Sequence, residues 1–297
     1  MRRPSSIVSG GTGYVGRFIV EELLAAGHEV TIMGRHPPQP GYFSRPVRFE
    51  PLSLHPQGIS PTIFQGADFF VHGAFDHVPG KYRGGEGRDP ESFRRRNLDG
   101  TMALFAAAKR AGVRSIVFLS SRAIYGPRPA GACLDEADEG RPDTLYGEIK
   151  LAAEKALQDL CGQGCAGVSL RLTGVYGPAG PGKPHKWAGL FSDYLAGKKI
   201  DARVATEVHG RDAAAAVRLV LDRPEQKAVL NVSDIVVDRR EILAIVKRES
   251  NSPHPLPPAG DPSQLNVMRT DRLRALGWAP GGRELFEETV ARLVRSG

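Results

Sequence analysis

Three glycines near the N-terminus, Gly10, Gly13 and Gly16, constrain the fold more than any other feature of the chain. They follow a short β-branched run and precede a helical pattern whose apolar face contains Val15, Phe18, Ile19, Leu23 and Leu24. The first glycine permits a tight turn, the second lets the backbone approach a diphosphate, and the third lets helix pack on strand. Free amides at the helix N-terminus favour that anion. The pattern predicts a dinucleotide site formed by Gly10, Thr12, Gly13, Tyr14, Val15 and Gly16.

Strand-like and helical segments alternate as far as residue 178. Strands are expected at 29–33, 47–50, 68–72, 115–119 and 167–172, and long helices at 91–111 and 145–160. Such alternation predicts an α/β fold, a Rossmann doubly wound parallel sheet. Beyond residue 178 the rhythm becomes irregular. We therefore expect a dinucleotide-binding domain over 1–178, with 204–235 returning to it, and a smaller α/β substrate lobe over 179–297.

Composition excludes several classes of function. The formal net charge is +7, but the cationic residues are spread along the chain, so no nucleic-acid partner is expected. No apolar run approaches the roughly 20 residues that span a membrane. The three cysteines, Cys133, Cys161 and Cys165, do not form a disulfide framework, and no ligand cluster predicts a metal. A cytoplasmic location is expected.

The end of the second expected strand bears on the cofactor. In dinucleotide folds an acidic residue at this position bonds the adenosine ribose and favours NAD. Here Gly34 and Arg35 follow instead. A guanidinium suits a 2′-phosphate, and glycine leaves room for it. The sequence therefore predicts a preference for NADP(H), with NAD(H) still possible; the alternative is that Arg35 only faces solvent.

A second group of polar residues carries the chemistry. Ser120 and Ser121 end the strand expected at 115–119, and Tyr146 and Lys150 open the next helix. A spacing of four places Tyr146 and Lys150 on one helix face. A nearby ammonium favours the phenolate, so Tyr146 could exchange a proton with a substrate hydroxyl while hydride moves to or from nicotinamide. A serine hydroxyl at the strand end would hold the same substrate oxygen.

Together these motifs resemble the extended short-chain dehydrogenase/reductases, the group of NAD(P)-dependent sugar epimerases, dehydratases and related reductases. The resemblance covers nearly the whole chain. It rests on GGTGYVG at 10–16, NLDGT at 97–101, LSSRAIYG at 119–126 and YGEIK at 146–150.

The resemblance assigns roles to individual residues. It implies Ser121, Tyr146 and Lys150 as catalytic, with Lys150 also bonding the nicotinamide ribose. Further cofactor contacts are implied for His72, Gly73, Ala74, Asn97 and Ser120, although Asn97 could equally be a packing residue. Implied substrate contacts are Ser121, Arg122, Thr173 and Tyr176.

Departures from the family pattern narrow the reaction. Family dehydratases carry an Asp-Glu pair where this chain has Arg122 and Ala123, so elimination of water is disfavoured. The span 177–209 is short for a nucleotide-sugar pocket, which favours a small, sugar-like substrate. Five basic residues in it either bind a diphosphate or are surface charge, the interpretation we favour: Lys183, His185, Lys186, Lys198 and Lys199.

Three functions remain. The first is an NADP-preferring oxidoreductase acting on a carbonyl or hydroxyl, with Tyr146 as acid and base. The alternative is an NAD(P)-dependent sugar or nucleotide-sugar epimerase that retains its cofactor. A non-catalytic NADP sensor is disfavoured because both Tyr146 and Lys150 are present. The resemblance also implies a homodimer built on a four-helix bundle of the segments 101–111 and 147–160.

Overall fold

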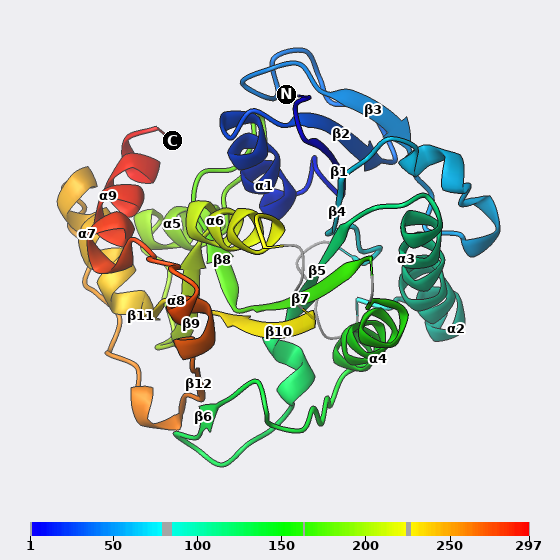
Figure 1. Cartoon of the computed structure of the whole chain (residues 1–297). Helices are drawn as coiled ribbons and strands as arrows, with labels where there is room; N and C mark the ends of the chain where they lie inside the picture. The colour runs from blue at the N-terminus through cyan, green and yellow to red at the C-terminus, as the bar shows by residue number, and fades with distance from the viewer. Residues whose placement is uncertain (1, 79–84, 163, 224–226, 297) are drawn as a thin grey trace.

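The structure, a computed structural model, describes residues 2–78, 85–162, 164–223 and 227–296. Its centre is a seven-stranded sheet in the order β10-β7-β5-β4-β1-β2-β3, with every neighbouring pair parallel (Figure 1). The strands are β1 (Ser5–Ser9), β2 (Glu29–Gly34), β3 (Arg48–Pro51), β4 (Phe69–His72), β5 (Ser115–Ser121), β7 (Ala166–Leu172) and β10 (Lys227–Val232). This confirms the predicted doubly wound α/β fold. The strand order reverses between β1 and β4, where such sheets open a ligand crevice.

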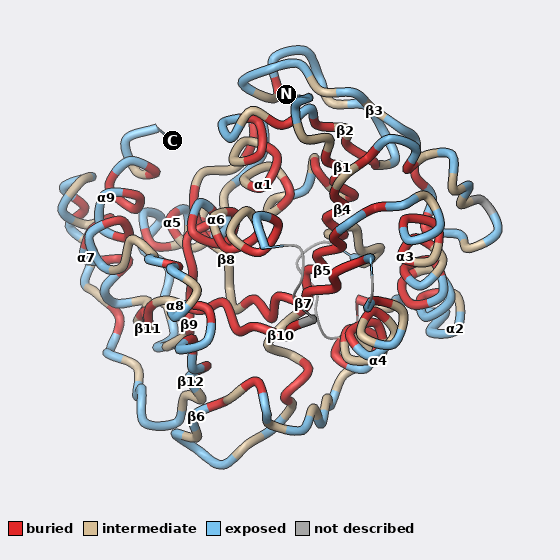
Figure 2. The backbone as a smooth tube through the Cα atoms, in the orientation of Figure 1, coloured by how far each residue is buried: buried red, intermediate tan, exposed pale blue. Residues whose placement is uncertain are grey.

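Helices cover both faces of the sheet. The α1 helix (Tyr14–Ala25) and α6 (Gly210–Leu221) pack on one face, and α3 (Gly100–Arg110) and α4 (Leu145–Leu160) on the other (Figure 1). Because both faces are covered, the central strands are buried along their length (Figure 2). Each face has its own apolar core, so the strand ends are held rigidly from both sides.

A second, smaller layer lies beyond the carboxyl edge of the sheet. Its three strands are β8 (Gly174–Tyr176), β9 (Val204–His209) and β11 (Ile235–Asp238), in the order β11-β9-β8. The helices α5 (Ala188–Leu195), α7 (Arg239–Ser250) and α9 (Gly282–Arg295) enclose its core. A short pair, β6 (Cys133–Leu134) with β12 (Val267–Met268), and the helix α8 (Asp271–Ala275) complete the regular elements apart from short helical turns. Within the described residues, no helix is both long and apolar enough to cross a membrane.

The long helix expected over 91–111 is present, but it contains a π-helical turn that the sequence did not predict. A short α2 helix (Pro90–Arg94) is followed by a π-helical turn, Arg95–Asp99, before α3 begins at Gly100. The Gly100 amide donates to the carbonyl of Arg95, five residues back. The wider turn lets the Asn97 side chain bond a neighbouring loop, as described below, a use of π-helical turns that recurs at functional sites.

Candidate active site

The glycine turn has the geometry that its spacing predicts. Gly10 has a φ of +73°, which favours glycine, and its carbonyl accepts from the Gly13 amide at 2.9 Å. A Cβ at Gly16 would lie only 2.1 Å from the Gly10 carbonyl oxygen, so only glycine lets α1 approach the turn. Gly13 caps α1 without a side-chain bond, and the first turn of α1 carries no acidic residue. These exposed amides fit the diphosphate of a dinucleotide.

The predicted catalytic residues meet at the carboxyl end of β5. Thr144 caps α4 by accepting the Gly147 amide at 3.1 Å, and a Cβ at Gly147 would lie 2.7 Å from the Ala123 carbonyl oxygen. The start of α4 is therefore pressed against the turn that follows Ser121. The Ser121 hydroxyl oxygen accepts from the Ala123 amide at 3.1 Å, which leaves its hydrogen to donate to a substrate oxygen.

Lys150 is buried beneath Tyr146. Its Nζ donates to the Leu119 carbonyl at 2.7 Å and lies 5.8 Å from the centroid of the Tyr146 ring, so the structure brings the pair together. The same Nζ lies 4.7 Å from the Phe75 ring and 4.6 Å from the Phe118 ring, positions that favour a cation. Burial nevertheless lowers the pKa of Lys150 to about 7.

This pKa shift makes folding stability depend on pH. Between pH 7 and about 10.5 the unfolded chain holds a proton on Lys150 that the folded chain has released, so raising the pH favours the folded state. We expect the free energy of unfolding to rise by about 2 kcal/mol from pH 7 to pH 9 through this residue. Urea titrations of the wild type and Lys150→Met at both pH values measure it. A pH-independent difference between the two proteins would contradict the shift.

A buried polar network lies directly behind the catalytic helix. Glu154, one turn after Lys150, forms an ion pair with Arg171 on β7, with 2.8 Å between the charged atoms and both side chains almost fully buried. Ser120 donates to Glu154, and Arg171 donates to the Tyr125 hydroxyl at 3.0 Å. The Ser120 hydroxyl is thus engaged on the inner side of β5. Its predicted contact with the cofactor remains a prediction.

Two further predicted residues support the neighbouring strand end. Asn97 accepts from the Asp76 amide at 2.7 Å and donates to the Asp76 carbonyl at 2.8 Å, so it clamps the loop that follows β4. His72 is completely buried and bridges Ser9 at 2.7 Å and Thr101 at 2.9 Å. Burial and then Lys150 lower the pKa of His72 to about 3, so this bridge uses the neutral imidazole.

Gly73 and Ala74 pass beside the glycine turn. A Cβ at Gly10 would lie 2.8 Å from the Ala74 amide nitrogen, and one at Gly73 would lie 2.9 Å from a Leu119 methyl carbon. The strand ends of β1, β4 and β5 are therefore packed as one edge. This edge is where the resemblance places the cofactor.

Arg35 stands at the end of β2 with its side chain 82% exposed. One of its terminal nitrogens lies 3.9 Å from a carboxylate oxygen of Asp76, which also pairs with Arg96 at 2.6 Å. Residue 34, where an acidic side chain would bond a ribose hydroxyl, is a glycine. The geometry leaves the Arg35 guanidinium available to an anion at this strand end.

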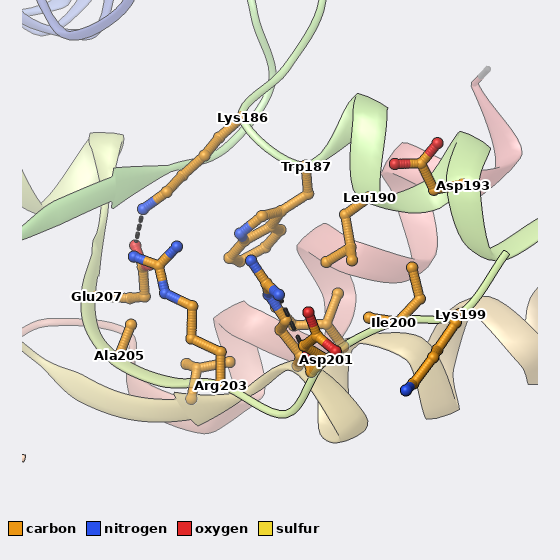
Figure 3. Close-up of a pocket in the computed structure, with 13 residues that line it drawn as sticks. Lys186, Trp187, Leu190, Asp193, Lys199, Ile200, Asp201, Arg203, Ala205 and Glu207 are labelled. Atoms are coloured by element: carbon orange, nitrogen blue, oxygen red, sulfur yellow. Dashed lines mark hydrogen bonds and ion pairs between the residues drawn. The ribbon is translucent and has the colours of Figure 1, made fainter. Parts of the chain in front are cut away.

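A pocket of about 420 Å³ lies in the smaller layer (Figure 3). Its larger apolar lining side chains are those of Trp187, Leu190, Ile200, Val237 and Ile242. Four cationic side chains, Lys186, Lys199, Arg203 and Arg239, line it together with three acidic ones, Asp193, Asp201 and Glu207. Sequence reasoning missed this pocket, because its residues come from the loop before α5, from α5 itself, from the segment between α5 and β9, and from β9, β11 and α7.

An ion pair between Lys186 and Glu207 lies at one end of this pocket (Figure 3). A Cβ at Gly174 would lie 2.4 Å from the Lys186 nitrogen, so the absent side chain leaves space for the pair. Burial raises the pKa of Glu207, and Lys186 opposes that effect. Gly174 lies two residues after Leu172. Leu172 pairs with Ser121 on the neighbouring strand of the sheet. Two residues span at most about 7 Å, so the Lys186–Glu207 pair is connected through Gly174 to the strand end beside Ser121.

The other predicted substrate residues, Arg122, Thr173 and Tyr176, are engaged by neighbouring groups of the protein. Arg122 donates to the Asn266 carbonyl at 3.0 Å, and Thr173 donates to the Thr206 carbonyl at 2.7 Å. Tyr176 is completely buried and stacks on Trp187, with 5.1 Å between the ring centroids. Tyr176 therefore supports a pocket wall, and any direct contact of these three with substrate remains a prediction.

The basic residues of the loop do not share one role. Lys198 pairs with Asp193 at 2.7 Å and is largely exposed, as surface charge would be. The interpretation as plain surface charge fails for Lys186, because it binds the buried Glu207. Lys199 lines the pocket, and Lys183 donates to the Thr12 carbonyl at 2.9 Å.

The chain is similar to known proteins in sequence and in fold. Residues 6–233 match the NAD dependent epimerase/dehydratase family. Human UDP-glucose 4-epimerase is 34% identical over 171 residues, 52% of this chain and 48% of that enzyme, so the chain spans about half the length of this relative. The dTDP-6-deoxy-L-talose 4-dehydrogenase (NAD(P)(+)) of Kitasatospora kifunensis is 29% identical over 96% of this chain and 93% of its own length. The structure of Thermus thermophilus UDP-glucose 4-epimerase in complex with NAD superposes with a TM-score of 0.79 at 28% identity, covering 99% of both chains.

The family model covers more than half of the chain, and the parallel sheet agrees with the fold of the solved epimerase structure. The chain belongs to the NAD-dependent epimerase/dehydratase family and is an enzyme of the extended short-chain dehydrogenase/reductase type.

Proposed function

We propose that the enzyme is an NADP-preferring oxidoreductase that moves a hydride between nicotinamide and a hydroxyl-bearing carbon of a sugar carried on a nucleoside diphosphate. The observation that carries the proposal is the position of Tyr146 over Lys150, beside the strand end at Ser121. The pocket of the smaller layer, in which four cationic side chains stand beside three acidic ones, supports a charged, phosphate-bearing substrate rather than a free sugar. The exposed guanidinium of Arg35 supports the preference for NADP.

The chain's own residues would divide the work as follows. When bound, the nicotinamide accepts or returns the hydride. The Tyr146 phenolate takes the proton from the substrate hydroxyl in the oxidative direction, and the Tyr146 hydroxyl returns it to the substrate oxygen in the reductive direction. Ser121 donates a hydrogen bond to the same oxygen, and a protonated Lys150 beneath the ring stabilises the phenolate form of Tyr146.

A second candidate is a nucleotide-sugar epimerase. It uses the same Tyr146 and Lys150 but returns the hydride to the opposite face of the sugar. The similarity to the UDP-glucose 4-epimerases of human and Thermus thermophilus supports it. The full-length similarity to a 4-dehydrogenase and the residues at the end of β2 support net transfer.

One assay separates the two reactions. Purified enzyme is mixed with NADP+ or NADPH and a panel of UDP- and dTDP-linked sugars, and free sugars serve as controls. Under the proposal, absorbance at the reduced-nicotinamide band changes with one nucleotide sugar and not with the free sugar. Isomerised sugar by chromatography, without a net absorbance change, would replace the proposal by the epimerase.

We also propose that the enzyme forms a homodimer through the segments 101–111 and 147–160. Met102 on α3 is 45% exposed, which is unusual for a large apolar side chain on a packed helix. Sedimentation equilibrium tests it, with a monomer as the opposing result.

A further inference from the structure

A loop from the smaller layer, residues 177–187, is fastened to the glycine turn. The Tyr14 hydroxyl donates to the Gly177 carbonyl at 2.6 Å, at the start of the loop. Lys183, in the middle of the loop, donates from Nζ to the Thr12 carbonyl at 2.9 Å. The loop therefore places a cation from the C-terminal third of the chain on the turn that forms the dinucleotide site.

Tyr42 fixes the position of this cation. Its hydroxyl donates to the Thr12 carbonyl at 3.0 Å, and the Lys183 nitrogen lies 5.4 Å from the centroid of its ring. A Cβ at Gly180 would lie 2.4 Å from the Tyr42 hydroxyl oxygen, so the loop rests directly on this side chain. Tyr42, Thr12 and the loop backbone thus hold Lys183 from three sides.

Thr12 borders the end of β2. A Cβ at Gly34 would lie 3.9 Å from the Thr12 hydroxyl oxygen, with nothing nearer to it. Arg35 follows immediately, with its guanidinium exposed. Thr12 therefore connects the two cations, because Lys183 bonds its carbonyl while its hydroxyl oxygen borders Gly34, the residue before Arg35. In this fold, that strand end takes the adenosine ribose and its 2′-phosphate.

We propose that Lys183 is a specificity-determining residue for the cofactor and binds the 2′-phosphate of NADP(H) together with Arg35. The inference rests on the proposed NADP preference and adds a residue from the substrate lobe to it. An ammonium has three donors, and Thr12 takes one, so two remain for phosphate oxygens. NAD(H) carries an uncharged hydroxyl in place of this phosphate, and its binding is therefore expected to depend little on Lys183.

Binding measurements test the proposal without catalysis. Kd values for NADP+ and NAD+ are measured by titration calorimetry at one low ionic strength for the wild type and Lys183→Met. Loss of a charge-assisted contact raises the Kd for NADP+ about tenfold, while the Kd for NAD+ stays within a factor of about two. Lys198→Met, which removes an exposed lysine paired with Asp193, is the matched control and leaves both values unchanged.

A fragment pair isolates the phosphate. Adenosine 2′,5′-bisphosphate carries the 2′-phosphate without a diphosphate bridge or nicotinamide, and adenosine 5′-monophosphate lacks it. Lys183→Met weakens binding of the first and not of the second if Lys183 contacts the 2′-phosphate. Equal weakening of NADP+ and NAD+ would mean that Lys183 acts on the diphosphate or on the loop, and would overturn the inference, as would no change.

The proposed cofactor preference is judged separately, on the wild type alone. If the wild type binds NADP+ no tighter than NAD+, that preference fails whatever the variant does. If the wild type prefers NADP+ and Lys183→Met keeps the full preference while Arg35→Ala loses it, the preference stands and the role of Lys183 falls.

Discussion

Replacing Tyr146 with phenylalanine is expected to lower kcat about 1,000-fold, because the change removes the proton donor and acceptor. The ring remains, with its edge-on contact to Phe75 at 5.0 Å between centroids and its place over the Lys150 nitrogen. The folded structure and the Kd for NADP+ are therefore expected to stay as in the wild type. Steady-state kinetics on the substrate identified by the nucleotide-sugar panel, with calorimetric titration of the cofactor, measure the two effects.

Tyr194→Phe is the matched control for losing a phenolic hydroxyl. The Tyr194 hydroxyl donates to the His254 carbonyl at 2.8 Å in the smaller layer, and Tyr194 does not line the pocket. This variant should keep its kcat and lose about 1 kcal/mol of stability with the hydrogen bond. If Tyr146→Phe retains more than about a tenth of the wild-type rate, acid–base catalysis belongs to another group.

Replacing Glu154 with glutamine is expected to lower the free energy of unfolding by about 3–5 kcal/mol, since it leaves a buried guanidinium unpaired. Glu154 and Arg171 are almost fully buried. The other side-chain hydrogen bond described for Arg171 goes to the uncharged Tyr125 hydroxyl, which cannot replace the Glu154 carboxylate. Glu154 also opposes the effect of burial on the pKa of Lys150, so the variant should lower that pKa further. Urea unfolding followed by circular dichroism measures the stability loss.

Two controls separate the buried pair from general effects of charge. Glu139→Gln breaks an exposed pair with Arg141 and should leave the unfolding midpoint unchanged. The double variant Glu154→Leu, Arg171→Met removes both charges and should regain most of the stability that Glu154→Gln loses. A stability loss below about 1 kcal/mol for Glu154→Gln would show that the pair is not desolvated as the structure indicates.

The local patterns of the sequence are sufficient to predict the fold class and the glycine turn. Alternating strands and helices predicted the parallel sheet, and the helix over 145–160 has the bounds that its periodicity predicted. The glycine spacing predicts the turn because local geometry requires glycine at two of the positions. Gly10 has a left-handed φ, and Gly16 lets the helix contact the turn closely. The spacing of Tyr146 and Lys150 is equally local, since four residues make about one helical turn.

Local patterns did not predict the π-helical turn inside the helix over 91–111. In this turn Asn97 bonds Asp76, a contact between residues that are 21 positions apart. The pocket of the smaller layer was missed for the same reason. Its residues span 186–242, and from the sequence alone their charged side chains are expected to face solvent. Only the folded structure places the loop before α5 beside β9.

By itself, the sequence determined the elements of the sheet, the glycine turn and the Tyr146–Lys150 pair, because each depends on residues that are close together along the chain. Only the tertiary structure decided which charges act together. Lys183 and Thr12 are 171 positions apart, and Lys186 and Glu207 are 21 apart, yet both pairs are in hydrogen-bond contact. A charge has no preferred partner along the chain. Its partner is set by the packing that brings distant segments together and removes the water between them.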